Sequence, residues 1–132
     1  MKLLLDTHVW IWSVALPGRL SRRVTAALSS PRNELWLSPV SVWEALVLIE
    51  KGNLRVKGPA GAWVDSALSA PGTLRDAPLT REVAMESRKV PLSHQDPADR
   101  FIAATAVVYG LTLVTADERL LSVRGLPTLA NG

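Results

Sequence analysis

Four acidic residues are spaced so that one fold could bring their carboxylates into a single pocket. Asp6, Glu44, Asp99 and Asp117 each fall near the expected end of a strand or the start of a helix. The chain has no cysteine and only two histidines, so these side chains would offer a cation oxygen ligands. Oxygen ligands suit hard divalent cations. The first hypothesis is therefore a site for Mg²⁺ or Mn²⁺.

Two of these acids follow apolar segments that are typical of short buried strands. Asp6 closes the run at residues 3–5, and Asp117 follows residues 113–115 after one intervening residue. Because ligands of open α/β sheets bind at the carboxyl ends of the strands, we expect both acids at one edge of a sheet. The alternative for each is a helix N-cap, Asp6 for the segment that begins at His8 and Asp117 for the short helix Glu118 to Leu121.

Two helix starts are compatible with the sequence before Glu44. Ser41 precedes Glu44 by three residues, the spacing of a capping box, which would explain Glu44 as a structural residue. Ser38 followed by Pro39 is an equally good N-cap and first helical residue. In that case Glu44 lies in the second turn among apolar neighbours, where burial of a carboxylate is costly unless a cation meets it.

The densest group of charges is the segment Asp96-Pro97-Ala98-Asp99-Arg100. Asp96 before Pro97 predicts an N-cap, which leaves Asp99 in the first turn, where the helix dipole favours a carboxylate. Capping explains Asp96 more fully than Asp99. We therefore expect Asp99 to be a ligand and Asp96 to act mainly as a cap.

Strand-like and helix-like segments alternate along the chain, as in βα units around a parallel sheet. The predicted strands are residues 2–5, 35–37, 74–77, 111–115 and 128–129. The predicted helices are residues 7–14, 21–28, 39–50, a segment around 63–68, 80–89, 97–109 and 117–121. Breaks are expected at Pro17-Gly18, Gly52-Asn53, Pro71-Gly72 and Gly110. The pattern predicts an α/β fold.

Size and composition predict one stable domain. The chain has 132 residues, 48% of them hydrophobic, and a mean hydropathy of +0.17, which is too apolar for a disordered chain. The absence of cysteine excludes disulfides and zinc–thiolate sites. The six residues up to Asp6 are too short for a signal peptide, and no apolar run approaches about 18 residues. We expect a cytoplasmic protein without a membrane partner.

The charge balance suits a polyanionic partner. The net charge is +3, but without the four candidate ligands 15 basic residues stand against 8 acidic ones. A basic exterior around an acidic pocket would hold and cut a polyanion, although a solvated surface explains the charge equally well. The candidates for holding such a polyanion are Arg19, Arg22, Arg23, Lys51, Arg55, Lys57 and Arg100. Arg100 could instead pair with Asp96.

Five segments occur in an order and at intervals typical of one family: Leu4-Leu5-Asp6-Thr7-His8, Ser41-Val42-Trp43-Glu44, His94-Gln95-Asp96-Pro97-Ala98-Asp99-Arg100, Ala103-Ala104-Thr105-Ala106 and Leu113-Val114-Thr115-Ala116-Asp117. Over nearly its whole length the chain resembles PIN-domain endoribonucleases, specifically toxins of the VapBC toxin–antitoxin class. The resemblance implies a single PIN-like domain over residues 1–132, built as an α/β/α sandwich. It further implies that Asp6, Glu44, Asp99 and Asp117 form an acidic quartet that binds Mg²⁺ or Mn²⁺, with Thr7 and Thr115 beside it.

The chemistry that the resemblance implies is metal-assisted hydrolysis of RNA phosphodiester bonds. The chain has no cysteine nucleophile and no evident His–Ser pair, so we expect water to attack. His8 and His94 are its only histidines, and a solvent-facing or capping role is favoured over proton transfer. The implied partners are an RNA substrate and a small antitoxin whose tail enters the acidic pocket. A homodimer, or a dimer of toxin–antitoxin pairs, is expected.

The tryptophans suggest a surface for another protein. Five of the seven aromatic residues are Trp, and the succession Trp10, Ile11 and Trp12 cannot all face one core. One side of that helix would then meet a second copy or an antitoxin, or else both sides are buried within the monomer.

Other families with acids at strand ends fit less well. A phosphatase of the haloacid dehalogenase type would place a second Asp where this chain has His8. A receiver domain needs paired acids at its first strand end and a downstream Lys at a strand end. The alternative that remains open is a non-catalytic PIN-like module that binds RNA or protein.

Overall fold

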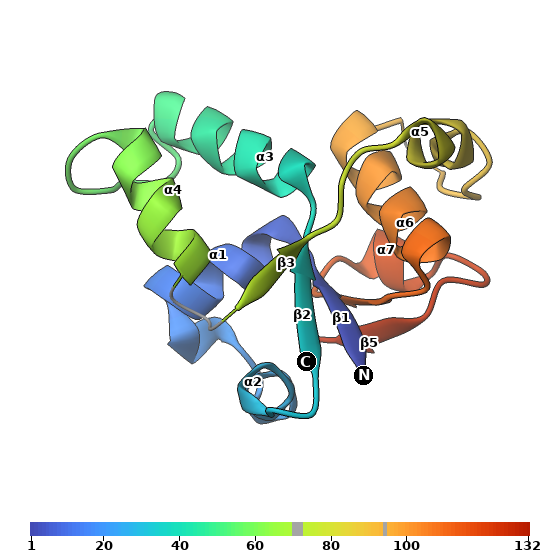
Figure 1. Ribbon diagram of the computed structural model, residues 1–132, viewed down its shortest axis with the longest axis horizontal. Helices are drawn as coiled ribbons and strands as arrows, with labels where there is room; N and C mark the ends of the chain where they lie inside the picture. Colours follow the sequence, from blue (N-terminus) through green and yellow to red (C-terminus); the bar gives the residue numbers. More distant parts are fainter. Residues whose placement is uncertain (70–72, 94) are drawn as a thin grey trace.

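A five-stranded parallel sheet forms the centre of the molecule (Figure 1). The structure, a computed structural model, describes residues 1–69, 73–93 and 95–132. The strands are β1 (Lys2–Leu5), β2 (Glu34–Leu37), β3 (Leu74–Asp76), β4 (Thr112–Thr115) and β5 (Thr128–Ala130). Their order is β3-β2-β1-β4-β5, and each neighbouring pair is parallel. The predicted parallel α/β fold is confirmed.

Helices cover both faces of this sheet. They are α1 (Thr7–Ala15), α2 (Arg22–Ser29), α3 (Pro39–Glu50), α4 (Ala60–Ser69), α5 (Arg81–Ser87), α6 (Pro97–Tyr109) and α7 (Glu118–Leu121), with a 3₁₀ turn η1 at Pro17–Arg19. In Figure 1, α1 to α4 lie on one side of the sheet and α5 to α7 on the other. The arrangement is the expected α/β/α sandwich.

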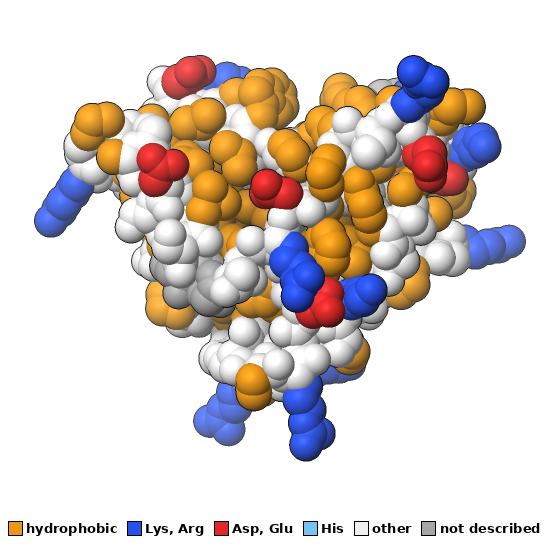
Figure 2. Space-filling view, viewed as in Figure 1, with side chains coloured by type: hydrophobic (Ala, Val, Ile, Leu, Met, Phe, Trp, Pro, Cys, Tyr) orange, Lys and Arg blue, Asp and Glu red, His pale blue; other side chains and the backbone are white. Residues whose placement is uncertain are grey.

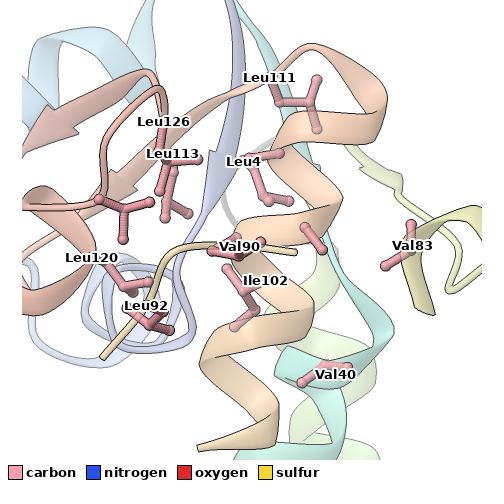
Figure 3. Packing of buried hydrophobic residues seen from close by; sticks show 14 of the residues in the cluster. Leu4, Val40, Val83, Val90, Leu92, Ile102, Leu111, Leu113, Leu120 and Leu126 are labelled. Carbon is pink, nitrogen blue, oxygen red and sulfur yellow. The ribbon is translucent and has the colours of Figure 1, made fainter. Parts of the chain in front are cut away.

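Strand β1 is buried on both faces, which explains its uninterrupted run of leucines. Leu3 and Leu5 belong to the hydrophobic cluster that contains Trp10 of α1. Leu4 points the other way, into the cluster that contains Ile102 of α6 (Figure 3). All three leucines are fully buried. Because this strand is fixed from both sides, the residue that follows it is held in a defined place.

Helix α1 packs its apolar face against the core of the monomer. Trp10 and Ile11 are buried, and the indole N–H of Trp10 donates to the carbonyl of Ala67 at 3.2 Å. Trp12 is only half-buried. Of the two alternatives for this helix, burial inside the monomer holds for Trp10 and Ile11, and Trp12 has a different environment that is described below.

Arg100 is a structural residue, so its inclusion among the RNA-binding candidates was wrong. It is 7% exposed, and its guanidinium donates to the carbonyls of Ser87, Val90 and Leu92 at 2.9 to 3.2 Å. These bonds tie α6 to the last residue of α5 and to the segment that follows it, where a long cationic side chain satisfies backbone acceptors away from water.

Two sequence predictions fall on parts of the chain that are not described. The expected helix end at Pro71-Gly72 and the imidazole of His94 lie outside the described residues. The described part contains no helix with the length and apolar character needed to cross a membrane.

Candidate active site

Asp6 is fixed at the carboxyl end of β1 by two hydrogen bonds. One carboxylate oxygen accepts the backbone N–H of Thr7 at 2.9 Å, and the other accepts the hydroxyl of Thr115 at 2.6 Å. Asp6 is therefore the N-cap of α1, as one of its two interpretations required. The same carboxylate is buried and lines a cavity, so the capping role does not exclude a second one.

Glu44 reaches the same cavity from α3. This helix begins at Pro39 with Ser38 as its N-cap, so the alternative start is the observed one and Glu44 lies in the second turn. The Thr7 hydroxyl donates to a carboxylate oxygen of Glu44 at 2.5 Å, and Thr7 Oγ1 also lies 2.8 Å from the hydroxyl of Ser41. Thr7 at the start of α1 and Thr115 at the end of β4 thus orient two of the four carboxylates.

The remaining acids come from the start of α6 and the end of β4. Asp96 is the N-cap of α6, where it accepts the N–H of Ala98 at 3.0 Å, and Asp99 follows in the first turn. Asp117 is the N-cap of α7, and its own N–H donates to Thr115 at 3.0 Å. The parallel strands β1 and β4 are neighbours, so the acids that follow them meet at one edge.

These elements enclose a cavity of about 530 Å³. The structure thus brings together all four predicted ligands and Asp96 around one space, with Thr7 and Thr115 bound to two of the acids. The cavity is lined by Asp6, His8, Trp12, Arg19, Glu44, Asp96, Asp99, Ala116, Asp117 and Arg119.

Burial and mutual repulsion raise the pKa values of three acids in this cavity. Burial raises the pKa of the Asp6 carboxyl, against the hydrogen bonds from Thr115 and Thr7. Burial also raises the pKa of Glu44, against the bond from Thr7. For Asp99, burial and then the neighbouring negative charges raise the pKa to about 7. A cation that entered the cavity would relieve this repulsion.

Arg119 already supplies one positive charge. Its guanidinium Nη2 lies 3.2 Å from Asp117 and 3.9 Å from Asp99, and its backbone N–H donates to Asp117 at 2.9 Å. Arg119 was not among the basic residues predicted to hold a polyanion. A pattern was available, because the Asp117 cap fixes the first turn of a short helix and an Arg two residues later remains within reach of the carboxylate.

The donor set fits a hydrated divalent cation. Among the described residues, no three His, Asp or Glu side chains are placed to enclose a metal ion. Mg²⁺ commonly retains several waters and takes only one or two carboxylates directly, so it does not need a closed cage. The oxygen donors, the raised pKa of Asp99 and the guanidinium beside it all describe a cavity that attracts cations.

Comparison with known families agrees with the architecture of this site. A family model described as PIN domain matches residues 3–126. The chain belongs to the PIN-domain family. This PIN domain is also 36% identical over 122 residues to Ribonuclease VapC22 of Mycobacterium tuberculosis (strain ATCC 25618 / H37Rv), which is 92% of this chain and 91% of that protein.

Solved structures share the fold of this PIN domain. One is VapBC2 from Rickettsia felis bound to a DNA fragment from their promoter, with a TM-score of 0.76 and 18% identity over 98% of both chains. Another is FitAcB from Neisseria gonorrhoeae, with a TM-score of 0.66 and 24% identity over 98% of this chain and 97% of the other. At these identities the likeness concerns the fold alone, and it confirms the predicted PIN-like architecture.

Proposed function

We propose that this PIN domain is an Mg²⁺- or Mn²⁺-dependent endoribonuclease that acts as the toxin of a toxin–antitoxin pair. The observation that carries the proposal is the meeting of Asp6, Glu44, Asp99 and Asp117 around one cavity at the carboxyl edge of the sheet. The identity to a protein named Ribonuclease VapC22 supports RNA as the substrate class.

In this proposal the four carboxylates surround the ion, one or two as direct ligands and the others through its water molecules, while Thr7 and Thr115 orient Glu44 and Asp6. When bound, the ion lowers the pKa of a water molecule and neutralises charge that develops on the phosphate. Asp6 is pre-oriented by Thr115, and Glu44 by Thr7, so these groups need little reorganisation. Asp96 fixes the start of α6 by capping its first turn.

Hydrolysis requires that water attack phosphorus and that the sugar oxygen leave. The water oxygen remains on phosphorus, one phosphorus–oxygen ester bond breaks, and the departing oxygen takes up a proton. Among the described residues that line the cavity there is no serine, threonine or cysteine side chain. Water is therefore the proposed nucleophile. Arg119 lines the cavity, and its guanidinium would contact a phosphate bound there.

The toxin role requires a protein partner, and an apolar groove is suited to one. The groove is lined by Pro39, Val40, Trp43, Leu79, Pro97, Ala98 and Phe101. Figure 2 shows hydrophobic side chains along the notch between the α3–α4 side and the α5–α6 side. Trp43 is 60% exposed here, and it also borders a hollow that contains Glu44 and His8. We propose that a small antitoxin follows this path into the acidic cavity, and that the complex assembles as a dimer of such pairs.

The nuclease proposal is tested by incubating the purified protein with tRNA and rRNA fragments in Mg²⁺, Mn²⁺ or EDTA. Wild type and Asp65→Asn should cut in either metal and not in EDTA, because Asp65 is exposed on α4 away from the cavity. Asp6→Asn and Asp99→Asn should not cut, although both should fold. Full cleavage by either cavity variant would remove that residue from the mechanism. RNA binding without cleavage by the wild type in any metal would favour a non-catalytic module.

The antitoxin proposal has a separate test. The protein, tagged at either end and purified from its native host, should bring down a small partner that blocks cleavage. Recovery of the free chain from both tagged forms would contradict this part of the proposal.

A further inference from the structure

One wall of the cavity is aromatic instead of acidic. His8 and Trp12 are four residues apart on α1, so their rings lie on the same face of the helix, with centroids 5.9 Å apart. This face begins at His8, two residues after the N-cap Asp6. Both side chains line the acidic cavity. A polar ring and a large indole thus stand beside the carboxylates.

Trp12 has no evident role in the hydrophobic core. It is half-buried, and it is absent from both hydrophobic clusters within the described part of the chain, whereas Trp10, Trp36 and Trp63 belong to or pack against them. A large indole that borders a cavity without contributing to the core is available for a ligand.

Arg19 extends this wall. Its guanidinium carbon lies 5.5 Å from the centre of the Trp12 ring, within the range of a cation–π contact. The side-chain amide of Asn131 donates to the carbonyl of Arg19 at 3.0 Å and accepts from the N–H of Ser21 at 2.7 Å. The backbone N–H of Asn131 donates to the backbone carbonyl of Thr115 at 2.9 Å. One asparagine thus anchors the Arg19 turn to the strand end that also orients Asp6.

We propose that Trp12, with His8 and Arg19, forms the surface on which a nucleobase next to the scissile phosphate stacks. Proteins that read single-stranded RNA stack unpaired bases on aromatic rings and on guanidinium planes. Carboxylates alone would repel RNA, whereas this wall gives a base an apolar face and the backbone a positive charge. The inference rests on the proposed function, because it assigns the substrate's base to the same cavity.

The molecule contains a matched Trp–Arg pair that serves a structural purpose. Arg75 lies 5.9 Å from the centre of the Trp36 ring, which stacks on Tyr109 at 6.1 Å and packs against the core. Trp36 does not line the acidic cavity. The same substitution at Trp12 and at Trp36 therefore separates loss of a stacking surface from loss of a tryptophan.

The test measures RNA binding in a protein that carries Asp99→Asn, so that the probe is not cut. The probes are a labelled single-stranded oligouridylate and an abasic ribose-phosphate oligomer of the same length and charge. Trp12→Leu should weaken binding of the oligouridylate by about 5- to 150-fold, the range found for one base–aromatic stack. Trp12→Phe should retain most of the affinity, and Trp36→Leu should leave it unchanged. Circular dichroism verifies that each variant is folded.

The abasic probe decides whether the lost contact is to a base. Removal of the bases should cost affinity in the parent and far less in Trp12→Leu. Equal affinity of Trp12→Leu and the parent for the oligouridylate, or an equal abasic penalty in both, would overturn the stacking site. If the stacking result holds and the wild type cuts no RNA, the nuclease proposal is refuted and the stacking site is retained. A parent that binds no RNA at all would overturn both.

Discussion

Replacement of Asp99 by asparagine should stabilise the metal-free protein at neutral pH while it removes a proposed ligand. The Asp99 side chain is 13% exposed, and burial with the neighbouring carboxylates raises its pKa from 3.8 to about 7. Since the folded state holds this proton more tightly than the unfolded state, the free energy of unfolding falls as the pH rises from about 4 to about 7. Asparagine has a similar shape and no charge, so the free energy of unfolding of Asp99→Asn should not show this fall.

The magnitude follows from the same difference. The gap between 3.8 and about 7 sets a ceiling of about 4 kcal/mol, at about 1.4 kcal/mol for each pH unit. Because Arg119 lies near Asp99 and water reaches the cavity, we expect about 1 to 2 kcal/mol in practice. The advantage of Asp99→Asn should be nearly absent at about pH 4 and complete at about pH 8.

Urea unfolding in EDTA at these pH values measures the effect. Asp65→Asn, which makes the same chemical change on an exposed part of α4, should match the wild type throughout. In a second series with Mn²⁺ in place of EDTA, the metal should stabilise the wild type and not Asp99→Asn. An Asp99→Asn protein that is less stable than wild type at about pH 8, or whose difference does not vary with pH, would refute the account of the cavity's electrostatics.

Three further variants test other contacts. Arg119→Ala should bind Mn²⁺ a few-fold more tightly by calorimetry, because a competing cation is removed, and weaker binding would contradict this. Thr7→Val should lower the cleavage rate about 10-fold without loss of fold, because Glu44 loses its hydroxyl partner, and an unchanged rate would count against that role. Arg100→Met should lower the free energy of unfolding by about 2 to 4 kcal/mol, because buried carbonyls lose their donors, and an unchanged melting temperature would contradict it.

Much of the site could be predicted because short local patterns determine it. The leucine run makes β1 a buried central strand, and Asp6 therefore follows at the sheet edge. Ser38 and Pro39 set the start of α3, which places Glu44 in the second turn. Each of these positions depends on residues only a few places away, where caps and strand ends leave few alternatives.

Contacts between distant segments were harder to foresee. Arg100 looks like any surface arginine in sequence, and only the path of residues 88–92 around α6 turns it inward to backbone carbonyls. Trp12 lies only two positions after the buried Trp10. Because both neighbours of Ile11 are tryptophan, the sequence does not show which of the two indoles faces the core. The hydrogen bond from Asn131 to the carbonyl of Arg19 joins residues 112 positions apart. Such contacts depend on tertiary packing.

The most direct test of the central claim is the location of the metal. Crystals soaked in Mn²⁺ at a concentration that supports RNA cleavage would give an anomalous difference map. We predict a peak in the cavity within ligand distance of Asp6 or Asp99, and no such peak in Asp99→Asn crystals treated in the same way. A wild-type cavity without a peak, while the same protein cleaves RNA in Mn²⁺, would contradict the proposal that these carboxylates hold the catalytic ion.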